Sequence, residues 1–186
     1  MTRKELPRLL GLIADIHIRN MLLAYYHKNE RLFDSRPAST KYHHSWDGGL
    51  GDHIAQVMEL GMGIFNVVKE QAVDMSCTLD DVLIIGFIHD LDKLDKYTND
   101  FPGAPWKYKE GRLNFDEIVR TVHICTTDIG LVLTENQLEA LSHHHGMWSN
   151  DRSSVFAYRP NDMTTLSAIT HTADLISTVT FGSKKP

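Results

Sequence analysis

The chain has few cysteines, no long apolar run and no signal-like segment at its start. Its two cysteines, Cys77 and Cys125, lie far apart and outside any CxxC pattern, which excludes a disulfide-dense scaffold and a cysteine-based zinc finger. The densest apolar stretch, from Val82 to Ile88, is too short to span a bilayer. The first residues lack the apolar core of a signal peptide. We therefore expect a soluble, cytoplasmic protein without a membrane segment.

Positive charge is also scarce. The formal net charge is −5 and the pI is near 6.1, which argues against a protein whose main role is wrapping nucleic acid. Glycine and proline are ordinary, so neither disorder nor a fibrous repeat is indicated. The 186 residues, 42% of them hydrophobic, suffice for one sizeable core. With no repeat or linker, residues 1–186 are expected to form a single domain.

The spacing of apolar residues is helical almost throughout. It predicts six helices, at about 4–29, 49–71, 78–94, 114–128, 134–145 and 162–180. Three helix starts carry the spacing of a capping box: Thr78 with Asp81, Asn114 with Glu117, and Thr134 with Gln137. Residues 31–51 and 147–161 read as loops, and 97–113 as a short hairpin or an ordered loop. The fold class is therefore all-α, a helical bundle with at most one small β-hairpin.

Eleven histidines are the most unusual feature of the composition, and histidine is the commonest metal ligand. Many fall on predicted helices close to carboxylates: His53, His89, Asp90, His123, His143, His144, His145, His171 and Asp174. Asp90 follows an apolar run, where an unpaired carboxylate is costly, so we expect it to meet a cation or a metal. Any one of these histidines alone is typical of a hydrogen-bonded structural residue. The set, without cysteine, suits Mn, Fe, Co, Ni or Zn with positions open for substrate.

Four segments carry a resemblance to a known family: Gly48-Gly-Leu-Gly-Asp-His53, His89-Asp-Leu-Asp-Lys93, His143-His-His-Gly146 and His171-Thr-Ala-Asp174. In this order they resemble the motifs of the HD-domain metal-dependent phosphohydrolase superfamily. The likeness is greatest to the branch with GGLxxH and HHG motifs, which includes 3′–5′ exoribonuclease-type HD domains. It spans residues from about 43 to 178. The resemblance implies an HD-type helical bundle that uses metal-activated water to hydrolyse a phosphate ester or anhydride.

The resemblance also implies roles for individual residues. His53, His89, Asp90 and Asp174 match the four defining ligands, while His123 and His144 match two further histidines of members that hold two metals bridged by the aspartate. Two divalent transition-metal ions are thus expected. Lys93 matches a lysine that contacts substrate phosphate, although Asp92 stands where glycine is usual and adds negative charge there. His145 is an alternative ligand to His144, and His171 is a candidate to orient Asp174 or to contact substrate.

Candidate substrate-binding residues lie in three loops. His43 and His44 precede the glycine turn, either within reach of substrate or as part of a simple polar loop. Aromatic and basic side chains elsewhere can stack a base and hold phosphate, or be solvated: Trp106, Lys107, Tyr108, Lys109, Arg112, Trp148, Arg152 and Arg159.

The small number of basic residues favours a mononucleotide over a nucleic-acid strand as the substrate. We expect a nucleotide phosphohydrolase. Three alternatives remain open. The first is a 3′–5′ exonuclease on single-stranded RNA or DNA. The second is a mixed-valence di-iron oxygenase similar to inositol oxygenase. The third is a metal-stabilised module that senses a nucleotide without cleaving it.

Overall fold

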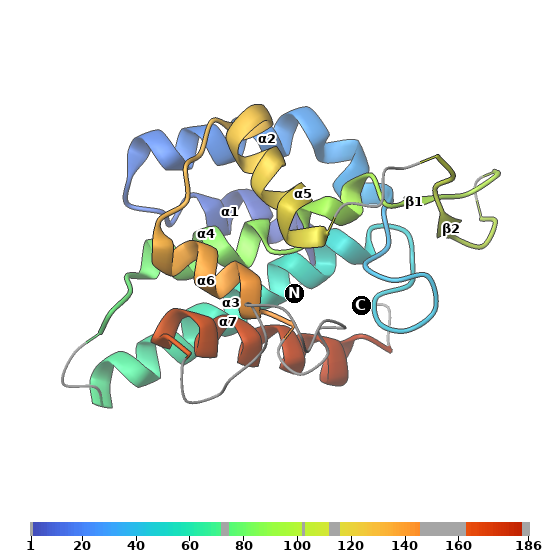
Figure 1. Cartoon of the computed structure of the whole chain (residues 1–186). Coiled ribbons are helices and arrows are strands. Elements are labelled where there is room, and N and C mark those ends of the chain that lie inside the picture. Colours follow the sequence, from blue (N-terminus) through green and yellow to red (C-terminus); the bar gives the residue numbers. More distant parts are fainter. Residues whose placement is uncertain (1, 72–74, 102, 112–115, 146–162, 184–186) are drawn as a thin grey trace.

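The computed structural model describes residues 2–71, 75–101, 103–111, 116–145 and 163–183. Helices dominate this part of the chain, with one two-stranded hairpin (Figure 1), so the all-α prediction is confirmed. Among the described residues, no helix is both long enough and apolar enough to cross a membrane. The α-helices are α1 (Leu6–Leu10), α2 (Ile16–Ser35), α3 (Gly49–Gln71), α4 (Leu79–Ile88), α5 (Glu117–His123), α6 (Glu135–His143) and α7 (Thr165–Ile176).

Helices α3 and α4 form the centre of the core. Every residue of α4 from Val82 to Ile88 is buried, as expected of a helix that is apolar on all sides. Two glycines let the helices approach closely. A Cβ on Gly61 would lie 2.9 Å from Val82 Cγ1, and one on Gly86 would lie 3.1 Å from Met58 Cγ. This contact places the beginning of α3 beside the end of α4.

The helix predicted over residues 4–29 is interrupted between α1 and α2, and α2 continues beyond the predicted end. Asp15 caps α2 by accepting hydrogen bonds from the N–H groups of His17 and Ile18. Asp80, in the first turn of α4, accepts hydrogen bonds from the backbone N–H groups of Ala14 and Asp15 at 2.8 and 3.0 Å. The break is therefore fixed by a tertiary contact that apolar spacing does not reveal.

Two of the predicted capping boxes are confirmed. Thr78 with Asp81 opens α4, and Thr134 with Gln137 opens α6, each with both reciprocal hydrogen bonds. The α-helical part of the third predicted helix ends at Ile88, and a 3-10 turn, Leu91–Leu94, completes the predicted length.

The start and end of α5 differ from the predicted pattern. Asn114 lies outside the described residues, and Asp116 is the N-cap, accepting from the N–H groups of Ile118 and Val119. After α5 the chain continues as a π-helical turn, Ile124–Ile129. A second π-helical turn, Ser177–Phe181, follows α7. Both turns have a wider hydrogen-bond ring than an α-helix, which changes the direction of the side chains that follow.

The hairpin predicted within residues 97–113 is present. Strand β1 (Tyr97–Thr98) pairs antiparallel with β2 (Lys107–Tyr108), and the hairpin extends from one end of the bundle (Figure 1). Trp106 connects it to the loop before α3. Its Nε1 donates to Asp47 at 3.0 Å, and the guanidinium of Arg36 lies 5.3 Å from the ring centre. The indole predicted to stack on a base is thus engaged within the protein.

Candidate metal centre

Four neighbouring helices bring most of the predicted ligands together. Helix α3 packs against α4 and α7, and α6 packs against α4 and α7 (Figure 1). Each helix contributes polar side chains at the end nearest the others, and most of these side chains are buried. The residues are His53 near the start of α3, His89 and Asp90 directly after α4, His144 and His145 directly after α6, and Asp174 on α7.

The Nε2 atom of His53 lies at the centre of this group. It is 3.3 Å from Asp90 Oδ2, 3.2 Å from Asp174 Oδ1 and 3.2 Å from His89 Nε2. One ligand atom from each of His53, His89 and Asp90 lies within 4.8 Å of the others. Three donor atoms thus converge on a space of the size that a metal ion occupies, and Asp174 lies next to one of them, His53.

A second group of ligand atoms shares Asp90. One atom from each of Asp90, His144 and His145 lies within 4.8 Å of the others, and His144 Nε2 is 4.0 Å from Asp90 Oδ1. Asp90 therefore presents Oδ2 to one group and Oδ1 to the other. The sequence left His144 and His145 as alternative ligands, and both lie close enough to Asp90 to share an ion with it.

Three of these imidazoles are anchored through Nδ1. Two of the partners are backbone carbonyls, which only accept hydrogen bonds, and the third is the Ser177 hydroxyl, whose hydrogen is donated to Gln56 Oε1. Nδ1 therefore carries the hydrogen in all three rings. Metal-ligating histidines are held in this way in metalloproteins. The pairs are His53 Nδ1 with Ser177 Oγ at 3.0 Å, His89 Nδ1 with the Gly86 carbonyl at 2.9 Å, and His144 Nδ1 with the Leu141 carbonyl at 2.6 Å.

The fit of this group to a metal ion is supported by an unpaired atom. His144 Nε2 is buried and has no hydrogen-bond partner among the described residues. A buried polar atom without a partner is costly, whereas the same lone pair is a suitable donor to a divalent ion. Imidazole nitrogen with carboxylate oxygen is a donor set for Mn, Fe, Co, Ni or Zn.

Burial and charge together set the protonation of the centre. Burial lowers the pKa of His53, but the carboxylates of Asp174 and Asp90 outweigh it and raise that pKa. Burial lowers the pKa of His89 to about 4. Burial raises the pKa of Asp174, but the hydrogen bond from His53 outweighs it and lowers that pKa. Burial likewise raises the pKa of Asp90, but the Lys93 ammonium outweighs it and lowers that pKa. Both carboxylates are therefore ionised at neutral pH, and the centre favours a positive ion or proton.

Lys93 lies on Asp90 inside the protein. Its Nζ is 2.7 Å from Asp90 Oδ2, and the side chain is buried. Burial lowers the pKa of Lys93, but the Asp90 and Asp92 carboxylates outweigh it and raise that pKa. Asp92 is buried as well, and burial raises the pKa of its carboxyl to about 7. Lys93 thus holds the carboxylate that both groups of ligand atoms share, from a buried position.

His145 belongs to the second group and packs against His144, whereas His171 supports the group from outside. The ring centres of His144 and His145 lie 3.9 Å apart, and His145 Nδ1 is 3.7 Å from Glu117 Oε2. His171 Nδ1 donates to the backbone carbonyl of His144 at 2.9 Å. The predicted supporting role of His171 is thus directed at His144, whereas the sequence suggested Asp174.

The structure does not bring His123 into either group. Its side chain is exposed at the end of α5, while Thr121 and Ile124 on the other side of the helix are buried. None of the three groups of ligand atoms found among the described residues includes it. This predicted ligand therefore stands apart from the candidate centre.

The predicted substrate-binding lysines are paired with carboxylates of their own region. Lys107 Nζ lies 2.7 Å from Asp100, and Lys109 Nζ lies 2.6 Å from Asp95. Tyr108 is exposed. Four further candidates lie outside the described residues: Arg112, Trp148, Arg152 and Arg159.

Gln56 and Ser177 belong to the site but were not predicted. Ser177 Oγ accepts from His53 Nδ1 and donates to Gln56 Oε1 at 3.0 Å, and His44 Nε2 donates to the same oxygen at 2.9 Å. Both residues are buried. Gln56 follows His53 by one helical turn and Ser177 follows Asp174 by one turn, so helical spacing from the predicted ligands is the signal that finds them.

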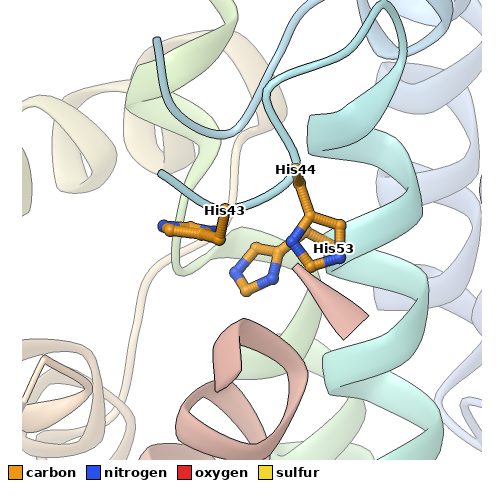
Figure 2. Close-up of side chains that lie close together, drawn as sticks. All are labelled: His43, His44 and His53. Atoms are coloured by element: carbon orange, nitrogen blue, oxygen red, sulfur yellow. The ribbon is translucent and has the colours of Figure 1, made fainter. Parts of the chain in front are cut away.

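His43 and His44 lie beside His53 (Figure 2). The ring centre of His53 is 5.3 Å from that of His43 and 5.0 Å from that of His44. Burial lowers the pKa of His43 to about 3 and that of His44 to about 4. The two loop imidazoles are thus neutral at neutral pH, and the alternative of a simple polar loop does not describe them.

The described residues therefore contain groups of histidine and aspartate side chains that could hold a metal ion. No family model, no curated protein and no solved structure matches the chain in the comparisons with known proteins.

Proposed function

We propose that this chain is a metal-dependent phosphohydrolase of the HD type, acting on a phosphate ester or anhydride of a nucleotide. The convergence of His53, His89 and Asp90, with both imidazoles anchored through Nδ1, is the observation that supports it. These ligands come from two of the motifs that resemble the HD superfamily. Asp174 and His144, from the other two, lie next to them.

In this proposal the two groups hold two divalent transition-metal ions. His53, His89 and Asp174 would hold one, His144 and His145 would hold the other, and Asp90, which belongs to both groups, would serve both. When bound, such ions supply Lewis acidity toward phosphoryl oxygens and lower the pKa of water. Imidazole ligands are neutral, so they reduce the positive charge of the bound ions less than carboxylates would. An anionic phosphate can therefore approach the centre.

Lys93 balances the charge of the proposed bridging ligand. Its ammonium holds Asp90 Oδ2 at 2.7 Å and fixes the orientation of the carboxylate. Because the lysine is buried next to two carboxylates, it stays charged as phosphate approaches. It therefore positions Asp90 and limits the repulsion between the centre and an anionic substrate.

Covalent catalysis by cysteine is disfavoured by the surroundings of both thiols. Burial raises the pKa of Cys125 to about 12 and also raises that of Cys77. A thiol is nucleophilic as its thiolate, and these environments suppress the thiolate. Direct attack by water is the consistent alternative.

The pairing of basic side chains favours a small substrate. Strand-binding enzymes neutralise several phosphates with free lysines and arginines. Among the described residues of the hairpin region, Lys107 and Lys109 already pair with aspartates, and the chain is acidic overall. A mononucleotide needs fewer such contacts than a nucleic-acid strand.

The test combines metal analysis with a substrate panel. Purified protein is loaded separately with Mn²⁺, Fe²⁺, Co²⁺, Ni²⁺ or Zn²⁺ and incubated with nucleotides, cyclic nucleotides and labelled single-stranded RNA and DNA. We expect phosphate release or nucleotide hydrolysis, and its loss in Asp90→Asn. Shortening of oligonucleotides without mononucleotide turnover would support the exonuclease instead. Oxygen consumption by the iron-loaded protein without phosphate release would support the oxygenase.

A further inference from the structure

The loop that carries His43 and His44 is held in a strained conformation. His44 has a φ of 47°, in the left-handed region that residues other than glycine rarely adopt. Its N–H donates to the Gly182 carbonyl at 2.7 Å, and its carbonyl accepts from the Ala38 N–H at 3.1 Å. Strain of this kind persists only where the surrounding structure enforces it, and it is frequent at functional sites.

Two glycines enclose this loop at close range. A Cβ on Gly49 would lie 2.0 Å from the His44 carbonyl oxygen, and one on Gly182 would lie 2.5 Å from His43 Cβ. Neither position has room for a side chain. The loop is therefore clamped between the start of α3 and the turn after α7, which fixes both imidazoles beside His53 (Figure 2).

Both loop imidazoles leave a nitrogen without a partner. Because His44 donates through Nε2 to Gln56 Oε1, its Nδ1 presents a lone pair. His44 Nδ1 and His43 Nδ1 are buried and have no hydrogen-bond partner among the described residues. The fold thus holds two buried nitrogens in place beside a third imidazole, and no described residue offers them a hydrogen bond.

We propose that His43, His44 and His53 form a subsite for a divalent cation, built from imidazole alone. One ligand atom from each lies within 4.8 Å of the others, so small side-chain rotations bring them to the spacing around one ion. Three imidazoles suit Zn²⁺, Ni²⁺ or Cu²⁺ better than Mg²⁺ or Mn²⁺, which prefer oxygen donors.

The surrounding charges favour a cation over a phosphate in this subsite. An acceptor lone pair such as that of His44 Nδ1 repels the oxygens of an anion. Asp90 and Asp174 lie 3.3 and 3.2 Å from His53 Nε2 and supply negative charge that offsets a bound cation.

The subsite and the metal centre of the proposed function share one ligand, His53. The inference rests on the proposed function only through this shared residue. His53 Nδ1 is bound to Ser177 Oγ, so Nε2 is the nitrogen that both sites use. An ion held by His43 and His44 therefore competes with the Asp90 centre for His53. A cation added in excess binds in a second, weaker step and disturbs the first ion.

The test uses Co²⁺ alone, measured by equilibrium dialysis and by its visible absorption, which depends on the number and kind of ligands. The test variant combines His43→Ala with His44→Asn, because asparagine tolerates the left-handed backbone that His44 adopts. His17→Ala, at an exposed histidine on α2, is the matched control. We expect wild type and control to bind Co²⁺ in two steps: the first fills the Asp90 centre, and the second, weaker step places one further ion in the subsite. The double variant should lose the second step, roughly one ion per chain, and keep the first.

The outcomes separate this inference from the proposed function. Equal Co²⁺ stoichiometry and spectra in wild type and double variant would overturn the subsite and leave the Asp90 centre intact. Asp90→Asn should remove the first step and retain a step that depends on His43 and His44. If Asp90→Asn changes nothing, the proposed function fails while the subsite stands. If the double variant unfolds, His43→Ala alone replaces it, because this change does not alter the left-handed residue His44. It should weaken the second step at least tenfold.

Discussion

The Nε2 atoms of His53 and His89 lie 3.2 Å apart, although both rings already use Nδ1 as the donor. His89 Nδ1 donates to a backbone carbonyl, and His53 Nδ1 donates to a hydroxyl that itself donates to Gln56. Two lone pairs at this distance repel each other unless a positive charge lies between them. The metal-free centre resolves this with a proton on His53, whose pKa is raised by Asp174 and Asp90 despite burial, and a metal ion would replace that proton.

Metal affinity should therefore increase with pH. The raised pKa of His53 means that its proton must leave before a metal binds, so affinity falls as pH drops below that pKa. We expect a decrease approaching tenfold per pH unit, with release of about one proton per ion bound. Calorimetric titration of Zn²⁺ into metal-free protein, in buffers of different ionisation enthalpy, measures both quantities. An affinity independent of pH with no proton release would contradict the assignment of His53.

The metal-free protein should lose stability in mild acid. Burial lowers the pKa of His43, His44 and His89 to about 3, 4 and 4, against about 6.5 in the unfolded chain. Their contribution is present above pH 6.5 and is lost as pH falls through the folded-state values, by up to about 1.4 kcal/mol per histidine and pH unit. The raised pKa of His53 makes the folded state more stable as pH falls, but this opposite effect comes from one group only. Urea unfolding between pH 7.5 and 4 tests this, and a free energy of unfolding that rises toward acid would refute it.

Asp90→Asn should abolish metal binding at the Asp90 centre, the first Co²⁺-binding step, and destabilise the fold. It leaves the buried Lys93 ammonium without its carboxylate, which costs about 3–5 kcal/mol. The double variant Asp90→Asn with Lys93→Met removes the unpaired charge, so we expect it to recover much of the stability and none of the metal binding at the Asp90 centre. Chemical denaturation and metal analysis measure the two effects separately. Retention of the first Co²⁺-binding step in the stable double variant would show that Asp90 is not a ligand.

Ser177→Ala should weaken metal binding without removing a ligand. Loss of the hydroxyl leaves His53 Nδ1 without its acceptor, and loss of such an outer contact typically lowers metal affinity 10–100-fold. Ser177→Thr retains the hydroxyl and should recover most of the affinity. Ser183→Ala, at an exposed serine nearby in the chain, is the control. Affinity equal to wild type in Ser177→Ala would mean that this contact does not orient His53.

His144→Ala and His123→Ala should differ in their effects. His144 Nε2 is buried close to Asp90, whereas His123 is exposed and outside the groups of ligand atoms. We expect His144→Ala to lower the number of bound ions and His123→Ala to leave it unchanged. Metal analysis after equilibrium dialysis gives the counts. The opposite result would restore the ligand set that the resemblance implied.

Local signals predicted much of the fold and the candidate centre. Capping boxes at Thr78 and Thr134 need only residues three positions apart, and a carboxylate after the apolar run of α4 identified Asp90. These features follow from interactions within one helix and its ends. The matched motifs therefore pointed to side chains that the fold brings together.

Other features depend on contacts between distant segments or on helix phase. The break between α1 and α2 is fixed by Asp80, which apolar spacing does not report. His123 lies where α5 passes into a π-helical turn. A shift of one residue along the helix there rotates a side chain from the core to solvent. His44 is held by Gly182, far away in the sequence.

The bond from the His44 N–H to the Gly182 carbonyl has a consequence for the order in which a newly made chain can assemble. His43, His44 and His53 are synthesised early, but the loop that carries two of them needs the turn after α7 before it can adopt its strained conformation. Asp174 and Ser177 arrive with the same late segment. Contacts over such long separations form slowly, so a ribosome-bound chain holds neither the cation subsite nor the Asp90 centre complete until residues 164–182 have emerged.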